Sequence, residues 1–266
     1  MSQRRIAICQ WCAPVEGPDV CRFAAEAGLN GVELDIGPLD QEMPMTDPAV
    51  REKYLAEAEK YGIRFPSLAL NVFGGDYTML RAWSDPRSEM TRHILKSGVM
   101  TAAAMGIPIL QVPSFGENAM KTREDMAITA EYLRYAARIA QKFRVTVGTE
   151  NTLTAAENRI LLAMVGERNC KVYFDNENMV FFRGEDPVDM IRTLGSAICE
   201  LHLKDGTEET LSCRPLGGGN ARVAECAEAL KEIDYKGWLV LENNYAGEGA
   251  VEAVKRDVTF LREAGL

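Results

Sequence analysis

Residues 144–150 have the sequence RVTVGTE, a short β-branched run that ends in a glutamate. Such a run is typical of a buried strand, because β-branched side chains pack well on a pleated surface. Similar runs occur along the rest of the chain: RIAIC at 5–9, GVELD at 31–35, RFPSLAL at 64–70, IPILQVP at 107–113, KVYFD at 171–175, ICELHLK at 198–204 and WLVLE at 238–242. Proline lacks the amide hydrogen that a central strand needs, so we place Pro66 at the start of its strand.

Helical patterns separate these strands. One amphipathic stripe, with apolar residues three or four positions apart, comprises Met126, Ala130, Leu133, Ala137 and Ala140. Strands that alternate with helices form a parallel sheet. Eight such units in 266 residues predict closure into a (β/α)₈ barrel, the TIM barrel. We therefore expect an α/β protein with a single domain over residues 1–266.

The composition excludes several classes of protein. The net charge of −9 disfavours extended binding to nucleic acid, because an acidic surface repels phosphate backbones. No apolar run is long enough to span a bilayer. The seven cysteines are odd in number and scattered, so a secreted disulfide framework is disfavoured. We expect a cytoplasmic protein whose partner is a small molecule, with no nucleic acid and no membrane; the composition is compatible with a homo-oligomer.

Cys9 and Cys12 form a C-x-x-C motif in the sequence CQWC. The motif indicates either redox or metal chemistry, or two ordinary thiols on the first strand and the loop after it. Because the sequence has no second pair of this kind, we favour the second interpretation.

Each of the last four predicted strands ends in a residue that can bind a metal. These residues are Glu150 in GTEN, Asp175 in YFDNEN, His202 in ELHLKDG and Glu242 in VLENNY. The carboxyl ends of neighbouring barrel strands converge at the mouth, where barrel enzymes keep their active sites. Alternate strand residues point to opposite faces, and all four candidates fall on the face opposite the apolar residues that would pack against helices.

The four residues predict a metal site, since salt bridges at strand ends, such as one between Asp175 and Lys204, explain single members better than the whole set. Three carboxylates and one imidazole suit Mn²⁺, Mg²⁺ or Co²⁺ better than Zn²⁺. A metal that binds the carbonyl and hydroxyl oxygens of a sugar would stabilise an enediolate. Glu150 and Glu242, on the outer two of these strands, would take and return the proton, which gives epimerisation or aldose–ketose isomerisation.

Together with these motifs, the segments AAEAGLNGVELD, PLGGGN and LKEIDYKGWLVLEN extend a resemblance over nearly the whole chain. The sequence resembles the xylose isomerase-like barrel superfamily of sugar phosphate isomerases and epimerases. The resemblance implies that Glu150, Asp175, His202 and Glu242 bind the metal, and that the two glutamates are the acid/base pair known from ketose 3-epimerases. Two positions depart from those epimerases: Asn178 replaces a histidine and Glu208 replaces an arginine.

Six further residues are candidates for substrate contacts: Lys204, Arg214, Asn178, Glu33, Trp11 and Phe73. Lys204 is expected to act as an acid or Schiff-base amine, or else to pair with a carboxylate such as Asp205. Arg214 and the glycines at 217–219 would anchor an anion, or else form a flexible loop. Glu33 is expected inside the barrel near the site. Trp11 and Phe73 would line an apolar sugar-binding wall, or belong to ordinary packing.

The leading hypothesis is a metal-dependent isomerase or epimerase of a ketose, keto-sugar or sugar phosphate. A second is a dehydratase of a keto-cyclitol, as in inosose dehydratases, where loss of a β-hydroxyl follows the same proton abstraction. A third is an endonuclease IV-like repair enzyme, but that enzyme needs a histidine-rich site and this chain has two histidines. A fourth is a non-catalytic sugar-binding protein, which would not need the complete ligand set.

Overall fold

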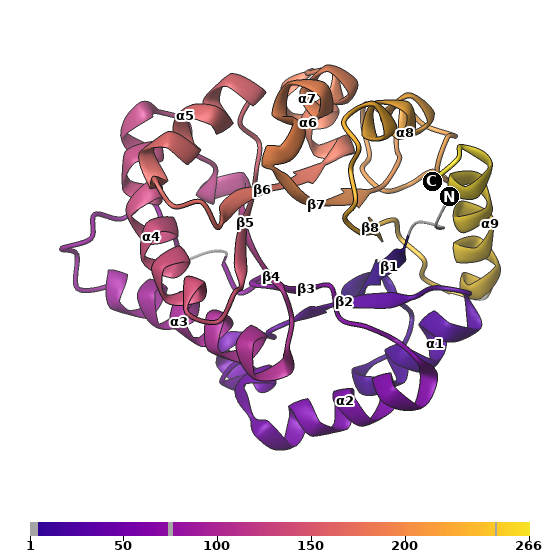
Figure 1. The fold of residues 1–266 in the computed structure, drawn as a ribbon, viewed down its shortest axis with the longest axis horizontal. Helices are drawn as coiled ribbons and strands as arrows, with labels where there is room; N and C mark the ends of the chain where they lie inside the picture. Colours follow the sequence, from indigo (N-terminus) through magenta and orange to yellow (C-terminus); the bar gives the residue numbers. More distant parts are fainter. Residues whose placement is uncertain (1–4, 74–76, 248) are drawn as a thin grey trace. The chain divides into compact units, whose positions relative to one another are not determined.

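The computed structural model describes residues 5–73, 77–247 and 249–266. Its parallel strands form a closed barrel in the order β1-β2-β3-β4-β5-β6-β7-β8, which confirms the predicted (β/α)₈ fold (Figure 1). The strands are β1 (Ile6–Cys9), β2 (Gly31–Asp35), β3 (Ser67–Ala69), β4 (Ile109–Ser114), β5 (Thr146–Asn151), β6 (Cys170–Asp175), β7 (Ile198–Leu203) and β8 (Leu239–Leu241).

Helices follow the strands along the chain. The α-helices are α1 (Val20–Glu26), α2 (Pro48–Tyr61), α3 (Ser88–Met105), α4 (Arg123–Gln141), α5 (Ala155–Val165), α6 (Asn176–Arg183), α7 (Pro187–Leu194), α8 (Val223–Glu232) and α9 (Ala250–Glu263). The 3-10 helices are η1 (Gln10–Cys12), η2 (Gly17–Asp19), η3 (Leu39–Gln41), η4 (Pro44–Thr46), η5 (Gly116–Asn118) and η6 (Gly195–Ala197). No helix in the described part of the chain is long and apolar enough to cross a membrane.

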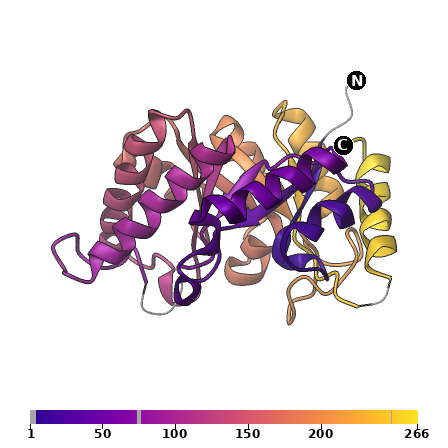
Figure 2. The ribbon, with the colours of Figure 1, turned by 90° about the horizontal axis from the view of Figure 1, so that it is seen from below.

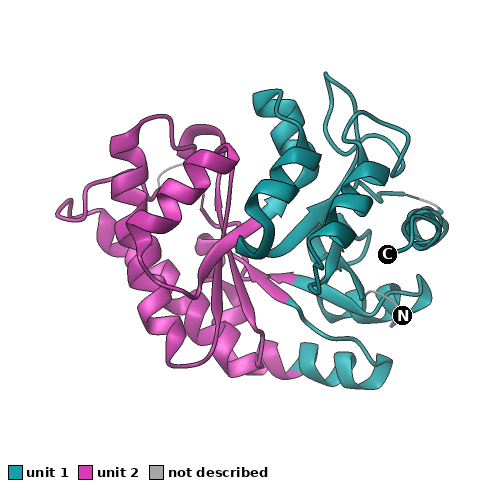
Figure 3. Cartoon of the chain, turned by 45° about the horizontal axis from the view of Figure 1, so that its top comes forward, with its two compact units in different colours: residues 1–33, 53–66, 174–266 teal, residues 34–52, 67–173 magenta. Residues whose placement is uncertain are grey.

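The chain divides into two compact units (Figure 3). Unit 1 comprises residues 1–33, 53–66 and 174–266, and unit 2 comprises residues 34–52 and 67–173. The single domain over residues 1–266 stays a prediction.

Unit 1 contains β1, β7 and β8, which pair in register. Ile8 lies opposite Leu241 between β1 and β8, and Leu203 lies opposite Leu241 between β7 and β8. Cys9 at the end of β1 lies opposite Glu33 of β2. This pairing brings the carboxyl ends of β1, β7 and β8 to the same edge, next to Glu33, because parallel strands in register end together.

Unit 2 contains β3, β4, β5 and most of β6. Helices α3 and α4 lie side by side in this unit (Figures 1 and 2). Helix α4 begins at a capping box between Thr122 and Asp125. The predicted stripe from Met126 to Ala140 is buried on this helix, so the amphipathic pattern is confirmed. Strand β3 is shorter than the run predicted, because it starts directly after Pro66, whose missing amide hydrogen prevents an earlier start.

Candidate metal centre

Three of the predicted ligands meet within unit 1. Asp175 is the last residue of β6, His202 lies in β7, and Glu242 directly follows β8. Nδ1 of His202 lies 3.3 Å from Oε2 of Glu242 and 3.8 Å from Oδ2 of Asp175. Both Asp175 and His202 are buried, whereas the Glu242 side chain is 16% exposed. Two carboxylates and one imidazole converge with separations that suit shared coordination of a divalent ion.

Asp175 is held in place by the helix that follows it. Its Oδ1 accepts a hydrogen bond from the backbone N–H of Asn178 at 2.7 Å, so Asp175 is the N-cap of α6. This bond leaves Oδ2 directed toward His202 and Lys204. Asn178, a predicted substrate contact, is buried next to Asp175 and supplies this amide.

Lys204 supplies the positive charge beside these carboxylates. Its Nζ lies 2.6 Å from Oε2 of Glu242 and 2.9 Å from Oδ2 of Asp175. The salt bridge between Lys204 and Asp175 that the sequence offered as an alternative is therefore present, and Glu242 is a second carboxylate partner. Burial alone would raise the pKa of Glu242, but the charges and hydrogen bonds of His202 and Lys204 hold it well below its usual range.

The net shift of the Asp175 pKa is in the opposite direction, upward from its usual value. Desolvation raises the pKa of Asp175, and the Glu242 charge adds to this, although Lys204 and His202 oppose it. A bound cation would favour the ionised form of both carboxylates, because opposite charge stabilises a carboxylate. The pair is therefore suited to a cation.

The other nitrogen of His202 faces a second group. Nε2 lies 2.6 Å from Oε2 of Glu33 and 3.4 Å from Sγ of Cys9. All three side chains are fully buried. Glu33 therefore lies directly beside His202, one of the predicted ligands.

The C-x-x-C motif holds free thiols. Cys9 ends β1 and Cys12 lies in η1, and neither forms a disulfide. Burial raises the pKa of the Cys9 thiol well above its usual value, which keeps it protonated.

Trp11, between these cysteines, contacts two of the candidate metal ligands. Its Nε1 donates a hydrogen bond to Oε1 of Glu242 at 3.2 Å, and its ring meets the His202 ring edge-on at 6.1 Å. Trp11 is 38% exposed, so part of its ring is open to solvent. Phe73 belongs to unit 2 and is buried there, where its amide donates to the Leu70 carbonyl.

Glu150 belongs to unit 2, near the end of β5. It is 2% exposed and accepts a hydrogen bond from Nε2 of Gln111 on β4. Sequence reasoning missed Gln111. The sequence could have indicated it, because Gln111 is the one amide side chain inside the apolar run IPILQVP. A buried polar side chain in a strand usually has a hydrogen-bond partner.

The loop between β7 and α8 is organised by Asp205. Its carboxylate accepts hydrogen bonds from the amides of Gly217, Gly219 and Ala221 at 2.9, 3.0 and 3.0 Å. The glycine amides that were candidates for anion binding are therefore already used within the chain, those of Gly217 and Gly219 by Asp205 and that of Gly218 by the Pro215 carbonyl.

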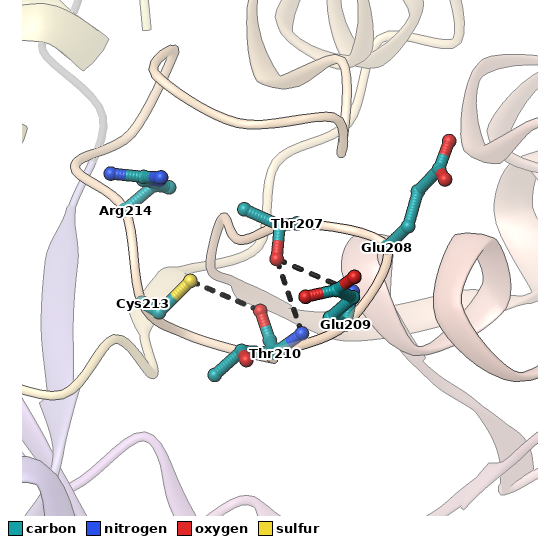
Figure 4. Close-up of a pocket in the computed structure, with 6 residues that line it drawn as sticks. All are labelled: Thr207, Glu208, Glu209, Thr210, Cys213 and Arg214. Atoms are coloured by element: carbon teal, nitrogen blue, oxygen red, sulfur yellow. Dashed lines mark hydrogen bonds between the residues drawn. The ribbon is translucent and has the colours of Figure 1, made fainter.

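Arg214 lies in the same loop, exposed, and lines a surface hollow of about 650 Å³ (Figure 4). The other lining residues are Thr207, Glu208, Glu209, Thr210 and Cys213. Two carboxylates against one guanidinium make the lining acidic, so the hollow by itself does not attract an anion.

Comparison with known proteins places the chain among related barrels. Residues 21–264 match the family described as xylose isomerase-like TIM barrel, and the chain therefore belongs to that family. It is 29% identical over 265 residues to the 2-epi-5-epi-valiolone 7-phosphate 2-epimerase of Actinoplanes sp., covering 98% of this chain and 95% of that protein.

Two further similarities bear on the fold and chemistry. Inosose dehydratase 2 of Bacillus cereus is 26% identical over 157 residues, which cover 50% of this chain and 52% of that protein. The D-psicose 3-epimerase of Clostridium cellulolyticum H10, solved with D-tagatose, matches with a TM-score of 0.80 at 18% identity and covers 98% of this chain and 99% of that chain. At that identity the likeness shows the fold.

Proposed function

We propose that the chain is a divalent-metal-dependent epimerase or isomerase of a sugar-like ketone, acting by proton transfer next to the carbonyl. The observation that carries this proposal is the convergence of Asp175, His202 and Glu242 at the carboxyl ends of barrel strands. Barrel enzymes place their catalytic residues at these ends. The similarity to a cyclitol phosphate epimerase over nearly the whole chain supports the same reaction class.

Glu150 is the fourth ligand in this proposal. Strand β5 pairs with β6 so that Thr149 lies opposite Val172. Glu150 directly follows Thr149, and Asp175 lies three positions after Val172, so both lie toward the carboxyl ends of their strands. The four proposed ligands are three carboxylates and one imidazole, with no thiolate among them. This set of donor atoms favours Mn²⁺, Mg²⁺ or Co²⁺ over Zn²⁺.

The two glutamates carry the proton in this mechanism. The bound ion supplies positive charge to the substrate oxygens on which negative charge develops. Glu242 holds one oxygen against Trp11 and the other against Lys204, so its carboxylate is oriented before substrate arrives. Glu150 is oriented in the same way by Gln111. One carboxylate removes the proton and the other returns it.

The substrate class is a keto-sugar or keto-cyclitol, with or without a phosphate. The relative from Actinoplanes acts, by its name, on a phosphorylated cyclitol. A second candidate function is dehydration of a keto-cyclitol, which the partial similarity to inosose dehydratase favours. Both reactions begin with the same proton abstraction, and they differ in whether a β-hydroxyl then leaves.

The endonuclease hypothesis has little support from the site. His202 is one of two histidines, and the other, His93, is exposed on α3. One imidazole does not provide a histidine-rich multi-zinc site.

The deciding experiment is incubation of the Mn²⁺-loaded protein in D₂O with a panel of ketoses, keto-sugars, inososes and their phosphates, followed by NMR. We expect deuterium to enter the carbon next to the carbonyl of at least one compound. A product of unchanged mass apart from deuterium indicates epimerisation or isomerisation, and loss of water indicates the dehydratase. The Asp175→Asn variant is the control. Exchange that persists undiminished in a chelated, metal-free sample would contradict the proposal.

A further inference from the structure

We infer that Glu33 is a positioning residue that fixes the ring of His202, so that Nε2 carries the hydrogen and Nδ1 is the nitrogen offered to the metal. This inference rests on the proposed metal site and assigns a role to a carboxylate outside it. The two ring nitrogens of His202 face two different clusters, and either cluster offers enough donor atoms to hold an ion. The geometry distinguishes between them.

On the Nε2 side the contact has the length of a hydrogen bond. Nε2 of His202 and Oε2 of Glu33 are 2.6 Å apart. Two ligand atoms on one ion, each bonded at about 2.0–2.1 Å, stand roughly 3 Å or more apart. A separation of 2.6 Å leaves no place for an ion between the two atoms, and it matches a strong bond to a carboxylate.

On the Nδ1 side the separations have the length expected between ligands of one ion. Oε2 of Glu242 and Oδ2 of Asp175 lie 3.3 and 3.8 Å from Nδ1. Metal binding requires the neutral imidazole, and when Nε2–H of that neutral ring donates to Glu33, the lone pair is on Nδ1 and points at this group. The hydrogen bond to Glu33 thus selects Nδ1 as the nitrogen of His202 that binds the metal.

The strand pairing keeps Glu33 in place. Glu33 lies opposite Cys9 in the β1–β2 ladder, and both side chains are fully buried. Sγ of Cys9 donates to Oε2 of Glu33 at 3.4 Å and lies 3.4 Å from Nε2 of His202. A carboxylate on a paired, buried strand has little freedom to move, so it orients the imidazole before metal arrives. Such partners typically change metal affinity by about 10–100-fold.

The first test is NMR of protein labelled with ¹⁵N-histidine and loaded with Zn²⁺, a diamagnetic ion that imidazole binds well. The chain has two histidines, and exposed His93 on α3 serves as the internal reference. We expect the signals of His202 to show a proton on Nε2 and a shift of Nδ1 on metal binding. Zn²⁺ bound through Nε2 would overturn the inference.

The second test is calorimetric titration of Zn²⁺ and Mn²⁺ into variants. Glu33→Leu removes the acceptor and should weaken binding by about 10–100-fold, whereas Glu33→Gln keeps an acceptor and should weaken it less. The matched control is Glu200→Gln. Glu200 is also fully buried and lies on β7 with His202, but its carboxylate makes no hydrogen bond with the described residues.

The control variant should bind metal within about threefold of the wild type, because Glu200 acts on His202 and Glu33 only through its charge and makes, among the described residues, no hydrogen bond that orients the imidazole. The inference would be overturned if Glu33→Leu bound metal as tightly as the wild type. It would also be overturned if Glu200→Gln lost as much metal affinity as Glu33→Leu. Metal bound through Nδ1 without turnover of any keto compound contradicts the proposed function and supports the inference. Metal-dependent turnover with the metal bound through Nε2 supports the proposed function and contradicts the inference.

Discussion

Lys204 donates a hydrogen bond from Nζ to Oε2 of Glu242 at 2.6 Å, and the same ammonium lies 2.9 Å from Oδ2 of Asp175. These are the carboxylates proposed to bind the metal. The ammonium thus takes the position of a counter-charge, and its side chain is only 8% exposed. A divalent ion bound to the same oxygens has to displace it or share them, so Lys204 opposes metal binding electrostatically.

The first prediction follows from this competition. Lys204→Met should bind Mn²⁺ at least about tenfold more tightly than wild type, because two cations within a few ångströms repel strongly in a buried site. Lys204→Arg keeps the charge and is the control. Isothermal titration calorimetry at low and high salt measures the effect. Equal or weaker binding by Lys204→Met would show that the lysine does not compete.

The second prediction separates proton transfer from metal binding. Glu242→Gln and Glu150→Gln each keep one oxygen for the ion but lose the basic carboxylate. Each variant should retain metal at high Mn²⁺ and lose turnover by about 10²–10⁴-fold. Proton exchange in D₂O should be lost from one face of the substrate in each variant. Near wild-type turnover in both metal-saturated variants would exclude the two-base mechanism.

The third prediction concerns metal and stability. The proposed Mn²⁺ site is assembled only in the folded chain, so Mn²⁺ should stabilise the protein by about 2.7 kcal/mol at a free concentration of 100 times Kd. Chelation should reverse the rise in Tm and abolish activity. His202→Ala should show little of the rise, because the imidazole is one of the proposed ligands. A Tm shift in His202→Ala equal to that of wild type would refute the assignment of this ligand.

The barrel could be predicted from the sequence because its strands are continuous β-branched runs, and parity along each run identifies a common face. Strand β2 spans Gly31–Asp35, as the pattern predicts. Asp175 and His202 could be grouped for the same reason. The position of a residue at the end of a strand can be predicted once the order of the strands in the barrel is known.

The supporting contacts could not be predicted in this way, because they join residues far apart in the chain. Trp11 and Glu242 are 231 positions apart, and no local pattern signals their hydrogen bond. Helix α6 begins directly after β6, although its sequence NENMVFFR resembles a polar loop at its start; the Asp175 cap stabilises that first turn. The Asp205 carboxylate among glycine amides was likewise hidden, since glycine-rich loops can bind either a ligand or a side chain.

The fourth prediction concerns alkaline stability. Burial, with a smaller contribution from Glu167, raises the pKa of Cys170 from 9.0 to about 12. Between these values the unfolded chain releases a proton that the folded chain keeps, so the free energy of unfolding falls as pH rises above 9.0. Between pH 8 and pH 10 this group alone should cost about 1.4 kcal/mol.

Urea unfolding under reducing conditions at these two pH values measures the effect. Cys170→Ala should lose less stability than wild type over this interval, whatever its stability at pH 8. Cys213→Ala, which removes an exposed thiol in place of a buried one, is the control. A wild-type slope in Cys170→Ala would show that the thiol is not protected from ionisation.

The fifth prediction tests the loop that Asp205 organises. A Cβ at Gly219 would lie 2.2 Å from the Gly206 carbonyl and 2.3 Å from Oδ1 of Asp205, whereas a Cβ at Gly218 would approach nothing closer than 3.1 Å. Gly219→Ala should therefore break the hydrogen bonds to Asp205, at a cost of about 1–3 kcal/mol for the local structure. Gly218→Ala should need only a small shift of its neighbours.

Hydrogen exchange followed by mass spectrometry measures this directly. In the wild type, the amides of Gly217, Gly219 and Ala221 donate to Asp205 and should be protected from exchange. Gly219→Ala should lose protection in the segment 217–221, and Asp205→Ala should lose it in the same segment.

Gly218→Ala is the matched control, because it adds the same methyl group one residue away, and it should keep the protection of the wild type. Protection that survives in Gly219→Ala would show that the three amides are held by something other than the Asp205 carboxylate. Protection lost equally in both glycine variants would mean that the loop responds to any added side chain, and that the carboxylate does not organise it.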